Sequence, residues 1–268
     1  MRTILSLSLV VAILVALSSV AVAAESVTIT YRADGKTVEL DGKLHRPSGA
    51  GPFPAVVLMH GCSGVEKNHG AWARKLEARG YMALIVEGFR SRGVSDVCTE
   101  RTFNKVSYAA RVADAYAGAA FLRARADVDG DRVGVIGWSH GGIIALKLAA
   151  KQPGKLSWTD VPIVPFRGVV AFYPYCGSAI DAVLPLLILI GTEDDWTPAA
   201  NCQGYEKMQR AIGAPVELVL YEGATHSFDE ASVGQGYVYA GHFLRYDGGA
   251  TADAAERLFA FLGRTLGD

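Results

Sequence analysis

A serine stands between two glycines at position 139, in the segment Gly137-Trp138-Ser139-His140-Gly141. The apolar residues 132–136 before it predict a buried strand, and residues 141–151 after it predict a helix. A sharp turn from strand to helix lifts a serine hydroxyl above the edge of a sheet, where it can act as a nucleophile. The alternative is an ordinary turn in which the serine caps the helix. The strand, the glycines and the partners described next favour the nucleophile.

A serine hydroxyl attacks a carbonyl only when a base removes its proton, and a carboxylate usually orients that base. On a strand-to-helix turn of this kind, the chain order is serine, then Asp or Glu, then His. Four of the six histidines precede or adjoin the serine, which leaves His226 and His242. His226 follows the predicted strand 216–221, whereas no predicted strand precedes His242. We therefore assign the base to His226 and predict a surface or packing role for His242.

Three acidic residues, Glu193, Asp194 and Asp195, follow the predicted strand 186–190. Loops at the carboxyl ends of parallel strands converge on the site of an open sheet, so this cluster is placed to orient the base. The position of Asp194 after its strand matches the acid of such hydrolases, and we assign it that role. Asp195 is the alternative, although it could instead cap the helix that follows.

Acyl transfer also needs hydrogen-bond donors for the oxyanion that forms on the substrate. One donor is usually the backbone N–H after the nucleophile, here that of His140, and another comes from the loop after an earlier central strand. That loop follows the apolar strand 55–59, so we assign the second donor to the backbone N–H of Cys62. Gly61 would allow a close backbone approach, and we expect the His60 side chain to brace the loop.

Strands and helices alternate along the rest of the chain, which predicts an α/β-hydrolase fold with a mostly parallel central sheet and helices on both faces. The first two strands are joined by a tight turn and should form an antiparallel edge. Residues 156–166 are irregular and are a candidate to overhang the site. The expected strands are 27–31, 37–44, 55–59, 82–86, 132–136, 169–172, 186–190 and 216–221, and the expected helices are 70–79, 106–126, 141–151, 198–212 and 252–266.

The sequence predicts a secretory signal peptide over residues 1–23, because Arg2 precedes the apolar run 4–17 and small residues follow this run. Serines interrupt this run, so the sequence favours a cleaved signal peptide over a permanent membrane anchor. We expect a periplasmic or secreted protein in which residues 24–268 form a single catalytic domain.

Export to an oxidising compartment allows disulfides to persist. We predict that Cys62 pairs with Cys98 and that Cys176 pairs with Cys202, each pair joining neighbouring loops of the site; four free buried cysteines are the alternative.

The chain has 26 Lys and Arg against 27 Asp and Glu, a formal net charge of -1, and no basic tract, so nucleic acid is not an expected partner. The acidic segment 127–131 resembles the opening of a calcium loop but lacks the later glutamate ligand, and we expect a structural turn there and no metal. The expected partner is a small ester or lactone, with the protein a monomer or a weak dimer.

Five segments together resemble the dienelactone hydrolase family, and they span nearly all of the chain after the signal peptide: residues 51–61, 92–93, 134–139, 191–198 and 223–228. The resemblance implies a cofactor-free α/β hydrolase whose triad maps onto Ser139, Asp194 and His226. Dienelactone hydrolases proper use cysteine as the nucleophile, and this chain has serine there, so the substrate does not carry over. We expect a serine hydrolase that cleaves carboxylic esters or lactones through an acyl-enzyme; a peptidase, or a binding protein on the same scaffold, is the alternative.

Signal peptidase should cut this chain after Ala23 or Ala24, because small residues there follow the apolar run. N-terminal sequencing of the exported protein checks this prediction, and an exported protein that still begins with Met1 would contradict it.

Overall fold

Eight strands form one sheet in the computed structural model, which describes residues 24–152, 154–177 and 180–267. Their order across the sheet is β1-β2-β4-β3-β5-β6-β7-β8. The pairs β1/β2 and β2/β4 are antiparallel, and every later pair is parallel. The strands are β1 (Glu25–Ala33), β2 (Lys36–His45), β3 (Phe53–Met59), β4 (Met82–Glu87), β5 (Val128–Trp138), β6 (Val169–Phe172), β7 (Leu186–Gly191) and β8 (Val216–Tyr221).

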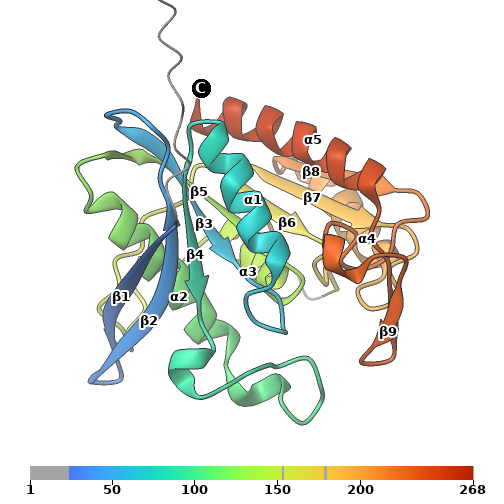
Figure 1. The fold of residues 1–268 in the computed structure, drawn as a ribbon, viewed down its shortest axis with the longest axis horizontal. Coiled ribbons are helices and arrows are strands. Elements are labelled where there is room, and N and C mark those ends of the chain that lie inside the picture. The colour runs from blue at the N-terminus through green and yellow to red at the C-terminus, as the bar shows by residue number, and fades with distance from the viewer. Residues whose placement is uncertain (1–23, 153, 178–179, 268) are drawn as a thin grey trace, which may run out of the picture.

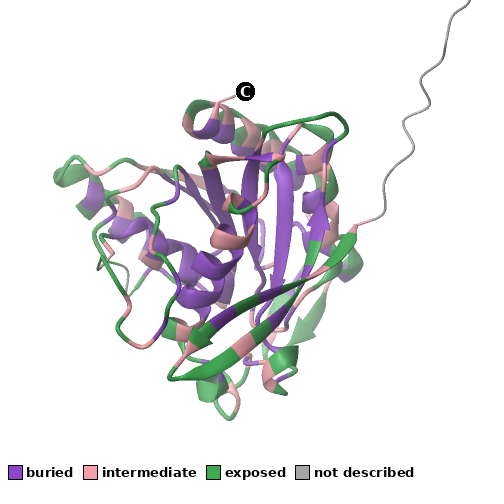
Figure 2. Ribbon diagram, turned by 90° about the vertical axis from the view of Figure 1, so that its left-hand side faces the viewer, coloured by how far each residue is buried: buried purple, intermediate pink, exposed green. Residues whose placement is uncertain are grey.

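The central strands are apolar without alternation, and all residues of β4, β6 and β7 are buried. A strand of this kind needs cover on both faces of the sheet. Helices α1 (Lys67–Ala78) and α5 (Gly248–Leu266) cover one face, and α2 (Tyr108–Arg123) and α3 (His140–Ala149) cover the other (Figure 1). Figure 2 shows these buried strands inside the molecule and the exposed outer surface of β1 and β2. The predicted α/β-hydrolase fold class is confirmed.

Loops at the carboxyl ends of the parallel strands bring distant parts of the chain together. A long one, 88–107, follows β4 and carries the short helices η1 (Arg90–Arg92) and η2 (Phe103–Lys105). A small hairpin of β9 (Tyr237–Tyr239) and β10 (His242–Leu244) follows β8. Both lie at the same edge of the molecule, the lower edge in Figure 1. Ser139, Asp194 and His226, which the sequence analysis selects, follow the carboxyl ends of β5, β7 and β8.

The structure departs from the expected elements in several places, and helix α5 begins four residues earlier than expected, at Gly248. β5 begins four residues earlier than expected, at Val128, and this first residue pairs with Phe53 ahead of a register shift in the strand pair. Residues 156–166 do not overhang the site; they pack against the far edge of the sheet, where Asp34 N–H donates to Trp158 O. The β9–β10 hairpin was not expected. The predicted signal peptide, 1–23, lies outside the described residues.

Helix α4 (Ala199–Ala211) packs on β7 and β8 and is tied to the loop after β6 by a disulfide between Cys176 and Cys202. A second disulfide joins Cys62 to Cys98. These are the two pairs named from the sequence. No helix in the described part of the chain has both the length and the apolar character that a membrane crossing demands.

Removal of the Cys176–Cys202 disulfide in the double variant C176S/C202S should lower the free energy of unfolding by about 2–4 kcal/mol, since the bond restricts the unfolded chain across a separation of 26 residues. Urea denaturation of the variant and the parent checks this. Equal midpoints and slopes for the two proteins would contradict it.

Candidate active site

Three side chains from three loops form a continuous hydrogen-bonded chain. Ser139 Oγ lies 2.9 Å from His226 Nε2, and His226 Nδ1 lies 2.8 Å from Asp194 Oδ2. Asp194 and His226 are buried, whereas Ser139 is partly exposed. The structure therefore brings together the three residues that the sequence analysis selects, with the histidine between the serine and the aspartate. This is the arrangement that activates a serine hydroxyl.

The turn at Ser139 has an unusual backbone, with φ of 52° and ψ of −112°. Such values are strained for a residue with a Cβ and are typical of functional turns. Two glycines make the turn possible. A Cβ at Gly137 would lie 2.0 Å from Gly141 O, and one at Gly141 would lie 2.0 Å from Met59 O. Only glycine at these positions lets α3 start directly over the end of β5.

Asp194 is held by donors other than the histidine. Thr197 donates from its backbone N–H at 2.8 Å to Oδ1 and from its hydroxyl at 2.9 Å to Oδ2, and Trp196 N–H donates to Oδ1 at 3.0 Å. These bonds fix the carboxylate so that one oxygen faces His226 Nδ1.

Asp195 does not take part in this chain. It is exposed, and its Oδ1 lies 3.2 Å from His242 Nδ1 on the hairpin. Pro198 is the N-cap residue of α4. The alternative prediction that Asp195 caps this helix is therefore wrong. The ring of His242 stacks on that of Trp196, with centroids 4.6 Å apart and an interplanar angle of 12°. His242 thus has a packing contact, as its sequence context indicates.

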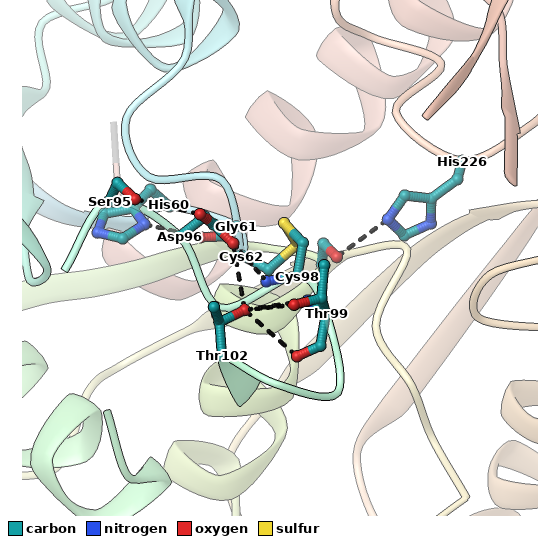
Figure 3. The surroundings of a disulfide bond; sticks show 10 residues. His60, Gly61, Cys62, Ser95, Asp96, Cys98, Thr99, Thr102 and His226 are labelled. Atoms are coloured by element: carbon teal, nitrogen blue, oxygen red, sulfur yellow. Dashed lines mark hydrogen bonds between the residues drawn. A yellow bond between two sulfur atoms is a disulfide. The ribbon is translucent and has the colours of Figure 1, made fainter. Parts of the chain in front are cut away.

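The two residues whose backbone amides are assigned to the oxyanion, Cys62 and His140, lie near Ser139. His140 is the first residue of α3, so its N–H is among those without a partner inside the helix. Gly61 approaches Ser139 closely, since a Cβ there would lie 3.5 Å from Ser139 Cβ. The next residue, Cys62, lines the cavity that contains Ser139 and His226. Figure 3 shows its disulfide to Cys98, with the ring of His226 directed toward these loops.

His60 braces the loop that carries Gly61. Its Nε2 accepts from the buried Arg111 guanidinium at 2.6 Å and from Gly88 N–H at 3.1 Å, so Nδ1 bears the proton and donates to Gly61 O at 2.8 Å. Arg111 also donates to His60 O at 3.0 Å. Burial lowers the pKa of His60, and the nearby charge of Arg111 lowers it further. A neutral, doubly anchored imidazole therefore positions the turn; the sequence analysis expected the bracing but missed Arg111.

Two other histidines near the nucleophile are neutral at physiological pH. Burial lowers the pKa of both His69 and His140 to about 3. His69 Nδ1 accepts from Glu66 N–H at 2.9 Å. His140 packs its ring among those of Phe103 and Tyr108, at centroid distances of 6.2 and 5.1 Å. Neither ring is hydrogen-bonded to Ser139, whereas His226 Nε2 lies 2.9 Å from Ser139 Oγ.

A buried carboxyl group beneath the site was missed by the sequence analysis. Asp229 Oδ2 accepts from the indole N–H groups of Trp72 at 2.7 Å and Trp138 at 3.0 Å and from Asn68 Nδ2 at 3.3 Å, and its Oδ1 accepts from Tyr173 at 2.6 Å. Burial raises the pKa of Asp229, and these four donors oppose the rise. The cluster ties α1, β5, the end of β6 and the His226 loop together. The one sign of this cluster in the sequence is Asp229 itself, an acidic residue three positions after His226.

Two cavities meet at Ser139. One, of about 160 Å³, is bounded by the 61–69 loop and by the segment 226–244, and it includes His226. The other, of about 200 Å³, lies between the Cys62–Cys98 disulfide, η2 and the start of α3. In the described part of the chain, no three His, Cys, Asp or Glu side chains form a group that could hold a metal ion.

The sequence matches the model of the Dienelactone hydrolase family over residues 40–266. A protein named "Putative carboxymethylenebutenolidase" from Methylorubrum extorquens is 27% identical over 197 residues, which cover 68% of this chain and 65% of that protein. The chain thus spans slightly less than two thirds of that relative's length.

Solved structures share the fold. The dienelactone hydrolase-like promiscuous phosphotriesterase P91 from metagenomic libraries superposes with a TM-score of 0.68 at 21% identity, covering 91% of this chain and 100% of that one. Thermogutta terrifontis esterase 2, in a form phosphorylated by paraoxon, also gives 0.68 at 20% identity, covering 93% of this chain and 97% of that one.

The Asp229 cluster provides a test of what holds the site in place. Tyr173→Phe removes one of the four donors and should lower the free energy of unfolding by about 1–3 kcal/mol, because a buried carboxyl oxygen loses its partner. Tyr116→Phe is the matched control, since the Tyr116 hydroxyl is buried with no hydrogen-bond partner among the described residues. Thermal or urea unfolding measures both. Equal stability losses for the two variants would contradict the role given to Asp229.

Proposed function

Because the chain belongs to the dienelactone hydrolase family, we propose that it is a serine hydrolase that cleaves carboxylic esters or lactones through an acyl-enzyme. The observation that carries the proposal is the hydrogen-bonded chain from Ser139 through His226 to Asp194, with separations of 2.9 and 2.8 Å. Each separation is within the range in which a proton passes between donor and acceptor.

In the proposed reaction, Ser139 Oγ attacks the ester carbonyl while His226 Nε2 takes its proton. The negative charge on the carbonyl oxygen is stabilised by the backbone N–H groups of Cys62 and His140. His226 then gives the proton to the leaving alcohol, which departs and leaves the acyl group on Ser139. Water repeats the sequence and releases the acid. Asp194 keeps Nδ1 protonated and stabilises the imidazolium in both halves of the reaction.

This chain has serine where dienelactone hydrolases proper have cysteine. A serine nucleophile depends more strongly on a base that removes its proton. A hydroxyl carries almost no negative charge at neutral pH, whereas a thiol near a base can be a thiolate. The serine therefore depends on His226 Nε2, which lies 2.9 Å from Ser139 Oγ, to take its proton during the attack.

The proposal also includes export. Two disulfides, Cys62–Cys98 and Cys176–Cys202, are compatible with an exported protein because such bonds persist in oxidising compartments. A periplasmic or secreted location would follow from cleavage of the signal peptide expected over residues 1–23.

Ser139→Ala should lower kcat/KM for a small activated ester by at least about 10³-fold, because the nucleophile is lost while the fold is kept. Asp194→Asn should cause a loss of similar size with normal stability, since the amide no longer holds the required tautomer of His226. Steady-state kinetics with the purified proteins measure both. Asp195→Asn is the matched control and should keep more than half of the activity. Retention of full activity by Ser139→Ala would end the proposal.

A further inference from the structure

The two cavities at Ser139 differ in chemistry, and this difference points to the kind of ester that fits. We call the cavity that includes His226 the polar cavity and the one beside the disulfide the apolar cavity. They share Ser139, Cys62 and Trp196 on their walls, so a single ester held at the serine extends one group into each. The inference rests on the proposed ester hydrolysis.

The direction of proton transfer decides which group enters which cavity. His226 Nε2, which lies 2.9 Å from Ser139 Oγ, must give its proton to the leaving oxygen, so that oxygen has to come within about 3 Å of Nε2. His226 lines the polar cavity and not the apolar one. The leaving alcohol therefore lies in the polar cavity, and the acyl group extends into the apolar cavity.

The polar cavity carries negative charge and aromatic faces. Glu230 is buried at its wall, where its carboxylate accepts from Asn68 N–H at 2.8 Å, and Glu66 is exposed at its rim. The rings of Tyr239 and Trp196, with centroids 6.0 Å apart, also line this cavity. No Lys or Arg is found among the described residues that line this cavity. Carboxylates repel an anionic group, and ring faces attract a cationic one.

The apolar cavity offers no charge to an acyl group. Its walls include Val97, Phe103, Ile143 and the Cys62–Cys98 disulfide, and the described residues around it contain no Asp, Glu, Lys or Arg. At about 200 Å³ it is smaller than the usual 300–1,000 Å³ of pockets for drug-sized ligands. A short alkyl or small aromatic acyl group matches this space.

We infer that the preferred substrate is a small ester with an apolar acyl group and an uncharged or cationic leaving alcohol, and that esters whose leaving alcohol bears a carboxylate are poor substrates. The carboxylates of Glu66 and Glu230 and the rings of Trp196 and Tyr239 determine the preference for the alcohol. Ile143 and Phe103 determine the preference for the acyl group.

Three butyrate esters with the same acyl group test the charge preference: the ester of choline, that of 3,3-dimethylbutanol, which has the same shape without charge, and that of 3-hydroxypropanoate, which is anionic. We expect kcat/KM for the choline ester to equal or exceed that of the neutral ester and to exceed that of the anionic ester by at least about tenfold. The ratio of cationic to anionic ester should shrink in 0.5 M salt, where screening is stronger than at low salt, to about threefold or less.

Two variants, each with a control variant, test the two cavities separately. Glu66→Gln should lower the ratio of kcat/KM for the cationic ester to that for the anionic ester, and Glu256→Gln on α5, an exposed residue outside both cavities, should leave this ratio unchanged. Ile143→Phe should lower kcat/KM for hexanoate relative to acetate esters by about tenfold or more, whereas the smaller change Ile143→Val should not.

The outcomes distinguish the inference from the proposed function. Hydrolysis that depends on Ser139 but favours the anionic ester, or ignores charge, would overturn the inference and leave the esterase intact. Absence of hydrolysis for every ester, with Ser139→Ala indistinguishable from the parent, would overturn the proposed function itself.

Discussion

The hydrogen bond between Ser139 Oγ and His226 Nε2 joins residues 87 positions apart in the chain, and most of the structure serves to keep it at 2.9 Å. The serine sits on a backbone turn with φ of 52°, which the chain would relax if the surroundings allowed. The close packing of Gly137 against Gly141, and of Gly141 against Met59 O, prevents that relaxation. The buried strands β3 and β5 thus hold the strained turn in place.

The histidine side of the bond is held by a different set of contacts. The loop after β8 carries His226 and, three residues later, Asp229, whose carboxyl accepts from four donors on other elements. The Tyr173 ring lies against His226 with a centroid distance of 4.6 Å while its hydroxyl binds Asp229. One residue therefore supports the base and anchors its loop. A buried polar cluster of this kind is costly unless it is fully paired, and here the pairing also sets the geometry of the site.

Much of this arrangement could be predicted from the sequence, because its signals are local. The glycines around Ser139, the apolar runs of the central strands and the order of serine, acid and base along the chain are all readable without coordinates. The choice between Asp194 and Asp195 depended on spacing alone, and the structure separates them by burial and by partner: Asp194 binds His226, and Asp195 faces His242.

What could not be predicted depends on contacts between distant residues. The four donors of Asp229 come from elements up to 161 positions away, and the pairing of Arg111 with His60 spans 51. The hairpin of β9 and β10 is short, with all of β9 exposed, so its pattern is too weak to indicate a strand. Residues 156–166 have the composition of a loop, which does not tell which side of the sheet they cover. The cavity walls, and with them the substrate preference, depend on these long-range contacts.

The account depends most on Ser139 being the group that becomes acylated. The most direct measurement is to treat the purified protein with an organophosphate such as paraoxon and to locate the adduct by peptide mass spectrometry. The account predicts one adduct, on Ser139, that forms much more slowly in the variant His226→Ala. An adduct on another residue, or labelling of Ser139 at the same rate without His226, would contradict it.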